Sequence, residues 1–257
     1  ANKSPKETNK DLLYVDNSNS GIDATKRDIK SGNGVASSLS LTDRSLRVVS
    51  STDSTTAFDV KNSGGTTKFL VDTTNDYVKA NGVHVNTQYA TFSVGNTELR
   101  TALADTHYGL LFQTGDLGSA PVAFGTGTEP ATSFTTAEAS DTRASDIVPL
   151  LWYVPDAISI DSVIGIEGAD AATGDVTRMH LYSYDFTSGA TNCLTNGTLL
   201  AHNSDVLNGG SEQPYKSTFT VDSASVAADK VILAFLRADT VNSDYSIKLI
   251  CKYHVTG

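Results

Sequence analysis

The chain has 257 residues, enough for one large all-β domain or two smaller ones. Hydrophobic residues make up only 39% and charged residues 19%. Serine, threonine, asparagine, aspartate and glycine fill the remainder and favour strands and turns over helices. The net charge of −10 repels phosphate, which disfavours nucleic-acid binding and favours a cationic partner. No apolar run approaches the roughly 18 residues of a membrane helix. The polar N-terminus lacks the core of a signal peptide, and Ala1 has the character of a residue exposed by removal of an initiator methionine, so we expect synthesis in a cytoplasm.

The first segment combines positive charge with a short apolar cluster. Its charged residues are Lys3, Lys6 and Lys10 against a single glutamate, and the apolar cluster is Leu12, Leu13, Tyr14 and Val15. Such a composition is typical of a tail that is disordered by itself. The following residues alternate isolated apolar positions with turns, and the one helix-like stretch, residues 23–30, is too short to stand alone. We therefore predict that residues 1–47 form an extended arm that docks on another surface.

Residues 56–86 show the two-residue period of half-buried strands. The apolar members of this pattern are Phe58, Val60, Phe69, Val71, Val83 and Val85. The turn pairs Gly64-Gly65, Asn75-Asp76 and Asn81-Gly82 lie between the runs. The pattern predicts four very short strands, which bury too little surface to be stable alone. We expect residues 48–88 to be a β stem that packs against other copies of itself, as a trimer.

Residues 11–41 contain three notable passages: residues 11–27, Ser31-Gly-Asn-Gly34 and Leu39-Ser-Leu41. Together these passages resemble the N-terminal part of structural proteins of tailed bacteriophages. The phrases Phe58-x-Val60, Phe69-x-Val71-Asp72 and Val78-Lys-Ala-Asn-Gly82 resemble the short β repeats of phage fibre stems. The resemblance implies a virion protein, commonly trimeric, with an N-terminal virion anchor and a distal head. It leaves open whether the fibre sits on the capsid or on the tail.

Residues 89–257 are predicted to form the head. Residues 99–103 have the pattern of a short helical turn, and the chain is loop-rich as far as residue 146. Strand-like runs then recur with turn signals between them, at residues 158–166, 177–186, 215–221, 230–237 and 245–255. This spacing without an amphipathic helix favours a β-sandwich or jelly roll. Residues 230–236 are apolar on both faces and are predicted to form a central strand.

Motifs of catalysis and metal binding are missing. The chain has no nucleophile elbow, zinc-protease motif or phosphate-cradling loop, so we expect no enzyme. Carboxylate pairs that cleave glycans converge only in space, which leaves a phage glycan hydrolase open as a third class, although such enzymes usually need a long repetitive β-helix. The five histidines lack the spacing of zinc ligands, and a metal shared on a trimer axis at His84 stays open. Glu167, Asp170 and Asp175 surround a glycine-rich turn and leave calcium open. No metal and no cofactor is predicted.

An aromatic cluster and two cysteines have alternative interpretations. The aromatic residues are Trp152, Tyr153, Tyr182, Tyr184 and Phe186. They either fill the core or, through Tyr182 and Tyr184, contact a glycan from an outer strand face. Cys193 and Cys251 are the only cysteines, and in a chain without a secretion signal we expect free thiols over a disulfide.

The sequence thus predicts an all-β chain with an arm (1–47), a trimeric stem (48–88) and a β-sandwich or jelly-roll-like head (89–257). The expected function is that of a structural virion protein made in the host cytoplasm, a capsid-decorating or head fibre protein docked through its arm. The alternative is a tail fibre or short spike that binds a host surface glycan. Its expected partners are copies of itself, capsid or tail proteins and, in the alternative, host polysaccharide, without nucleic acid or membrane insertion. The host and the receptor stay open.

Overall fold

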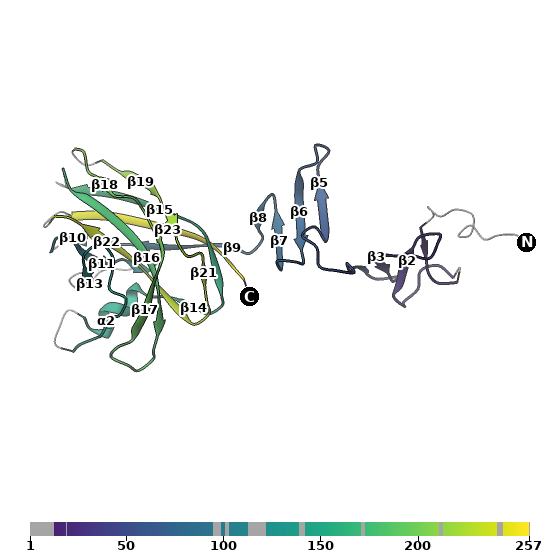
Figure 1. Ribbon diagram of the computed structural model, residues 1–257, viewed down its shortest axis with the longest axis horizontal. Helices are drawn as coiled ribbons and strands as arrows, with labels where there is room; N and C mark the ends of the chain where they lie inside the picture. Colours follow the sequence, from purple (N-terminus) through teal and green to yellow (C-terminus); the bar gives the residue numbers. More distant parts are fainter. Residues whose placement is uncertain are drawn as a thin grey trace, which may run out of the picture. The chain divides into compact units, whose positions relative to one another are not determined.

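The computed structural model describes residues 13–18, 20–94, 99–100, 103–112, 122–138, 142–170, 173–210, 213–240 and 244–256 (Figure 1). These residues are nearly all β-strand and turn, which confirms the predicted all-β class. The described helical elements are α2 (Ala144–Ile147) and a single 3-10 turn, η1 (Val148–Leu150). Neither they nor any other helix in the described ranges has the length and apolar character needed to cross a membrane. Contacts divide the chain into residues 1–85 and residues 86–257.

The first part of the chain folds as a small antiparallel sheet in the order β1-β2-β3-β4. Its strands are β1 (Tyr14–Val15), β2 (Arg27–Lys30), β3 (Ala36–Leu41) and β4 (Leu46–Val48). The prediction of an extended arm is therefore wrong for residues 14–48. The turns were predicted, but the strand pairing across them was not: Gly34 adopts a φ of +84°, the Ser31 N–H donates to the Val35 carbonyl, and Lys30 pairs with Ala36 across that turn. Lys3, Lys6, Lys10 and Leu12 lie outside the described residues.

The stretch at residues 23–30, which has a helix-like sequence pattern, is not helical in the structure. Its second half is strand β2, paired with β1 on one side and β3 on the other. Two ion pairs brace this strand: Lys30 Nζ lies 2.6 Å from Asp16 Oδ2, and Arg27 Nη2 lies 3.0 Å from Asp23 Oδ2. Ladder pairing on both edges satisfies more backbone groups than one isolated helical turn does, so the strand is favoured.

The second sheet agrees with the prediction of four short strands. It has the order β5-β6-β7-β8. The strands are β5 (Phe58–Lys61), β6 (Thr67–Asp72), β7 (Tyr77–Ala80) and β8 (Val83–His84). The turns fall at the predicted pairs, with φ of +80° at Gly65, +55° at Asp76, and +50° and +80° at Asn81 and Gly82. Two successive positive φ angles match the Asn-Gly hairpin turn.

Residues 86–257 form two larger antiparallel sheets. In the described residues the first has the order β12-β9-β23-β15-β19, with β10 also on β23 and β21 also on β15. Its strands are β9 (Thr87–Ser93), β10 (Leu99–Arg100), β12 (Leu111–Phe112), β15 (Ile158–Asp170), β19 (Tyr215–Thr218), β21 (Ser225–Val226) and β23 (Asp244–Val255). Residues 99–100 are thus a strand on β23, and the helical turn predicted for residues 99–103 is wrong there.

The second of these sheets has the order β13-β11-β22-β16-β17-β20, with β14 also on β22 and β18 also on β16. Its strands are β11 (Thr106–Gly109), β13 (Ala123–Thr126), β14 (Trp152–Val154), β16 (Val176–Phe186), β17 (Leu194–His202), β18 (Val206–Leu207), β20 (Thr220–Val221) and β22 (Lys230–Ala238). The long strands β15, β16, β22 and β23 dominate this part of the chain (Figure 1).

The two sheets pack through one core and give a β-sandwich-like arrangement. Alternate residues of β22, such as Ala234 and Leu236, join Met179 of β16 and Leu249 of β23 in this core. The other face of β22 is covered by Val122, Phe124, Phe134, Ile147 and Leu150, and the Phe124 ring lies 4.9 Å from that of Phe235 between centroids. Strand β22 lies between β16 and the pair β11 and β14, and its residues 231–236 are buried. The prediction of a central strand at residues 230–236 is confirmed.

Candidate functional site

The register of β5 to β8 gathers their apolar residues on one face. Phe58 pairs with Val71 and Val60 with Phe69, and Phe69 in turn pairs with Ala80. Residues that pair across antiparallel strands point to the same side of the sheet. The ladder continues through Val71 with Val78, Ala80 with Val83, and the Val85 N–H that donates to the Val78 carbonyl. We call this set the apolar face: Phe58, Val60, Phe69, Val71, Val78, Ala80, Val83 and Val85.

Most of the apolar face lies open in the single chain. The exposed fractions are 42% for Phe58, 45% for Val60, 37% for Phe69, 44% for Val83 and 59% for Val85. The Phe58 and Phe69 rings meet edge to face with centroids 6.1 Å apart, so the exposed patch is already ordered. A groove of about 500 Å³, lined by Val48, Val49, Phe58 and Val71, extends it. Contiguous apolar surface of this kind marks an interaction site.

The opposite face of the same sheet is mostly polar, with Leu70 half-buried between Asp59 and Lys79. Lys61 Nζ pairs with Asp59 Oδ2 at 3.1 Å, and Lys79 Nζ lies 4.2 Å from the centroid of the Tyr77 ring. His84 is on this face opposite Lys79, with its ring 5.0 Å from that of Tyr77. Burial alone would raise the pKa of Asp72, but hydrogen bonds from Asn75, Tyr77 and Thr74 hold that pKa below its ordinary value. The sheet thus has one face suited to water and one suited to a protein partner.

The arm residues within the described part of the chain are partly exposed. Leu13 is 64% exposed, and Tyr14 and Val15 are half-buried in β1. The pairing of Leu39 with Val48 and of Leu41 with Leu46 places a second apolar stripe on one face of β3 and β4. Leu46 of this stripe is 61% exposed. Residues 13–48 therefore also present apolar surface.

The aromatic cluster divides between core and surface. Tyr182 and Tyr184 are 4% and 0% exposed, and burial raises the pKa of both phenols. The Tyr184 hydroxyl donates to the Ala131 carbonyl at 2.8 Å, and the Tyr182 hydroxyl donates to Glu129. A sugar can stack only on an open ring face, so the glycan-contact interpretation of these two residues is corrected in favour of the core. Tyr153, at 49% exposed, is the tyrosine of the cluster that reaches the surface.

Two histidines far apart in the sequence meet inside the second head sheet. His107 of β11 and His180 of β16 are both 0% exposed, and their ring centroids lie 5.0 Å apart. Burial lowers the pKa of His107 to about 4, with a smaller lowering from Arg237. Burial, with His107 and Arg178 adding to it, lowers the pKa of His180 to about 3. Sequence spacing could not reveal this pair because the register of β11 and β16 on β22 creates it.

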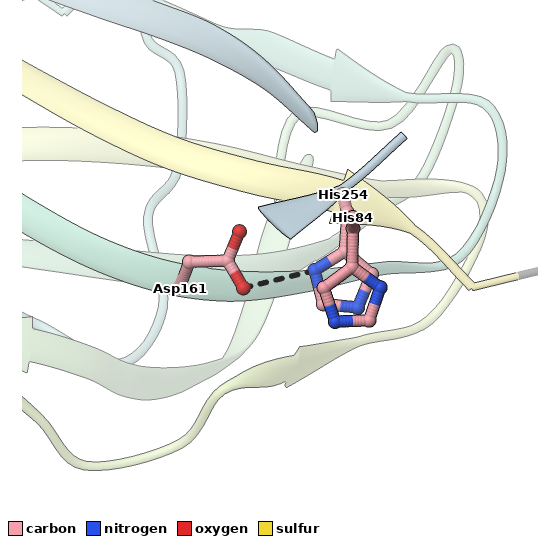
Figure 2. A group of neighbouring side chains, drawn as sticks. All are labelled: His84, Asp161 and His254. Carbon is pink, nitrogen blue, oxygen red and sulfur yellow. Dashed lines mark hydrogen bonds and ion pairs between the residues drawn. The ribbon is translucent and has the colours of Figure 1, made fainter. Parts of the chain in front are cut away.

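A third histidine lies on the first head sheet. Figure 2 shows the hydrogen bond between His254 Nδ1 and Asp161 Oδ1, which are 3.0 Å apart. His254 belongs to β23, and Asp161 lies at the irregularity where the register of β15 on β23 shifts between Ile160 and Ser162. The shift is the local reason that the carboxylate reaches the imidazole.

The carboxylates left open for calcium are engaged by hydroxyl groups. Thr177 Oγ1 donates to Glu167 Oε1 at 2.8 Å, and the Tyr245 hydroxyl donates to Asp175 Oδ2 at 2.8 Å. Glu167 is 3% exposed, and burial raises its pKa to about 7. The side chain of Asp170 lies outside the described residues. A carboxyl that burial moves toward its neutral form, with a hydroxyl donor in place, is a weak starting point for a calcium ligand.

The cysteines are free thiols, as expected: Cys193 is half-buried and Cys251 is buried. Burial raises the pKa of the Cys251 thiol to about 12, so this group is unreactive.

The sequence reasoning missed an aromatic groove of about 750 Å³ in the head. Its aromatic lining residues are Tyr89, Phe112, Trp152, Tyr153 and Tyr253. Four strands contribute to it, β9, β12, β14 and β23. Only Trp152 and Tyr153 were singled out, because they are neighbours in the sequence, whereas the other three join them through sheet packing.

Comparison of the sequence with known protein families and with curated proteins found no family model and no relative that matches this chain.

Proposed function

We propose that this chain is a non-enzymatic structural protein of a tailed-phage virion, a homotrimeric capsid-decorating or head fibre protein. In this proposal residues 48–88 form the β stem, residues 89–257 form the head, and the N-terminal arm, residues 1–47, docks on the particle. The single observation that supports assembly is the open apolar face of β5 to β8, in which Val85 is 59% exposed.

The physical argument for assembly is that the apolar face costs free energy while it stays in water. Fully burying a valine or phenylalanine side chain is worth about 1.5–3 kcal/mol. Five such side chains on a small four-stranded sheet are exposed by more than a third. Copies that pack this face together remove it from water and leave the charged faces outside. Three copies around one axis close such an arrangement without a remaining apolar face, and the resemblance to fibre stems favours this number.

The arrangement of strands in the head supports a jelly-roll-like fold in this proposal. Strands β9, β23, β15 and β19 are neighbours in one sheet, and β11, β22, β16 and β17 are neighbours in the other. The chain moves from one sheet to the other between β9 and β11, between β15 and β16, and between β22 and β23. Repeated crossing between two packed antiparallel sheets is a feature that β-sandwiches and jelly rolls share.

Particle localisation tests the proposal. Antibody against the head, applied to purified particles and viewed by electron microscopy, should decorate capsids at regular sites. Failure of the antibody to label any part of intact particles, while it binds the free protein, would contradict a virion location.

The alternative of a tail fibre or short spike that binds a host glycan is favoured by the aromatic groove in the head. The same experiment separates the two functions, because in this case the label would gather at the tail.

A further inference from the structure

The aromatic groove combines ring faces with hydrogen-bonding groups. The Trp152 ring stacks on Phe112 with an interplanar angle of 6° and a centroid distance of 5.7 Å, and Tyr253 lies 4.8 Å from Trp152 between centroids. These three rings hold one another in place on the inner side of the groove. Tyr89 and Tyr153 are 67% and 49% exposed and form its open side. The Tyr153 hydroxyl donates to Asp229, which fixes the orientation of that ring.

The register of β9 on β23 places polar and basic residues beside these rings. Tyr89 pairs with Lys252, and Ser93 pairs with Lys248. The intervening residues Ala90 and Phe92 are buried in the core, so Tyr89, Thr91 and Ser93 point outward together with the two lysines. Lys248, Thr91 and Ser93 line the groove. The groove thus offers the Lys248 ammonium group, two hydroxyls and the exposed Tyr89 ring from the first head sheet, and the exposed Tyr153 ring from β14 of the second. Lys252 lies beside Tyr89, next to the groove lining.

This chemistry suits a sugar better than a purely apolar ligand. A pyranose ring has a C–H face that lies against an aromatic ring and an equatorial rim of hydroxyls that needs hydrogen-bond partners. Tyrosine and tryptophan provide rigid contact area with little loss of side-chain entropy. The volume of about 750 Å³ lies within the range of small-molecule sites. In a chain with a net charge of −10, Lys248 in the groove and Lys252 beside Tyr89 add positive charge at this end of the site, away from the Asp229 carboxylate that binds Tyr153, and so favour a negatively charged ligand there.

We propose that this groove binds an acidic oligosaccharide, with Tyr89 and Tyr153 stacking on sugar rings and Lys248 and Lys252 pairing with carboxylate or sulfate groups. The proposal deepens the tail-fibre alternative and does not depend on the number of copies in the assembly. The competing occupant is a strand from a second copy, because within the described residues β9 pairs with β12 only at Phe92 and Ser93. The side-chain groups favour the sugar over a strand. An added strand binds mainly through backbone hydrogen bonds, which do not require the exposed lysines.

The chain contains a built-in reporter for the test. Trp152 is its only tryptophan, and it lines the groove. Tryptophan fluorescence of the full-length protein is therefore measured during titration with a panel of short acidic fragments: oligogalacturonate, oligoalginate, hyaluronan fragments and oligosialate. Neutral malto-oligosaccharides serve as the comparison. We expect a saturable spectral change with at least one acidic member, weakened by added salt, and at least tenfold lower affinity for the neutral fragments.

Matched variants assign the binding to the groove. Tyr89→Ala and Lys248→Gln should each lower the affinity by about tenfold, because each removes a contact that is already exposed and carries little of the fold. Phe186→Ala removes another exposed ring of the head, and Lys216→Gln removes another exposed lysine, both outside the groove. Both controls should bind with unchanged affinity.

Three results would overturn the proposal. Equal affinity for neutral and acidic fragments would show that the lysines do not select the ligand. The absence of any response across the panel would show that the groove does not bind these sugars. Loss of assembly in Tyr89→Ala, measured as molecular mass by light scattering, would assign the groove to an interface between copies. Since mass and fluorescence are separate readouts, failure of glycan binding is distinguishable from failure of the trimer.

Discussion

Phe69 of β6 lies directly opposite Val60 of β5, and the two side chains share a face of the sheet on which they are 37% and 45% exposed. An apolar cross-strand pair normally stabilises a sheet by burying both partners. Here the pair is aligned but left open, together with Phe58, Val83 and Val85 of the same face. This open pair is the main reason to propose that copies of the chain assemble through this sheet.

Removal of the N-terminal segment should abolish docking and leave the rest folded. Deletion of residues 1–15 takes away the three lysines, the apolar cluster and the two-residue edge strand β1. The deleted protein should keep its strand content by circular dichroism and its molecular mass, but fail to cosediment with stripped particles. A separate Lys3→Gln, Lys6→Gln, Lys10→Gln variant should slow attachment more than it weakens the final complex, since exposed charges mainly steer encounter. Normal cosedimentation of the deleted protein would place the anchor elsewhere.

Glu167→Gln should stabilise the head at alkaline pH. Burial raises the pKa of Glu167 to about 7 from its ordinary 4.5, so the folded state holds this proton more tightly than the unfolded state. The wild-type free energy of unfolding should then fall relative to the variant as pH rises from about 5 to 8, by up to about 3 kcal/mol. Glutamine keeps an oxygen to accept the Thr177 hydroxyl. Urea unfolding at pH 5 and pH 8 measures the difference, and parallel curves for the two proteins would contradict it.

The buried histidine pair should make the head sensitive to acid. His107 and His180 have lowered pKa values, about 4 and about 3, because burial penalises their charged forms and Arg178 and Arg237 add repulsion. The unfolded state therefore binds more protons below pH 6.5, and stability is lost as pH falls from there toward 4. His180→Gln should reduce the loss of thermal stability between pH 7 and pH 5. His254→Gln is the control, because His254 lies on the other head sheet, where its Nδ1 is 3.0 Å from Asp161 Oδ1. An unchanged loss of stability in His180→Gln would contradict the prediction.

The sequence predicted the parts of the fold that local patterns specify. Alternation at Phe58, Val60, Phe69 and Val71 and the Asn81-Gly82 turn were enough for the four strands β5 to β8, and the two-sided apolar run at residues 230–236 was enough for a central strand. Sheet pairing over long sequence separations lay beyond such patterns. It explains why Tyr182 and Tyr184 are buried, and how Tyr89, Phe112 and Tyr253 meet Trp152. The sheet of residues 14–48 was missed for another reason, because its strands are short, with few apolar residues, although they pair locally.

The protein should show no hydrolase activity. The sequence lacks the common catalytic motifs, and the buried carboxyl Glu167 is hydrogen-bonded to a threonine inside the head. Incubation with the acidic and neutral oligosaccharides used for binding should release no new reducing ends. Release that a single aspartate or glutamate substitution abolishes would contradict the structural role.

The most direct test of the central claim is the molecular mass of the assembly in solution. Light scattering of the purified chain at micromolar concentration should give about 81 kDa, three times the chain mass of 27.1 kDa. Phe69→Asp should dissociate or aggregate the protein, because it places a charge in the centre of the apolar face. Lys68→Asp introduces the same group at the neighbouring position of β6, which points to the opposite, mostly polar face of the sheet. This variant should leave the mass unchanged. A stable species of 27.1 kDa for the unaltered chain would contradict the account.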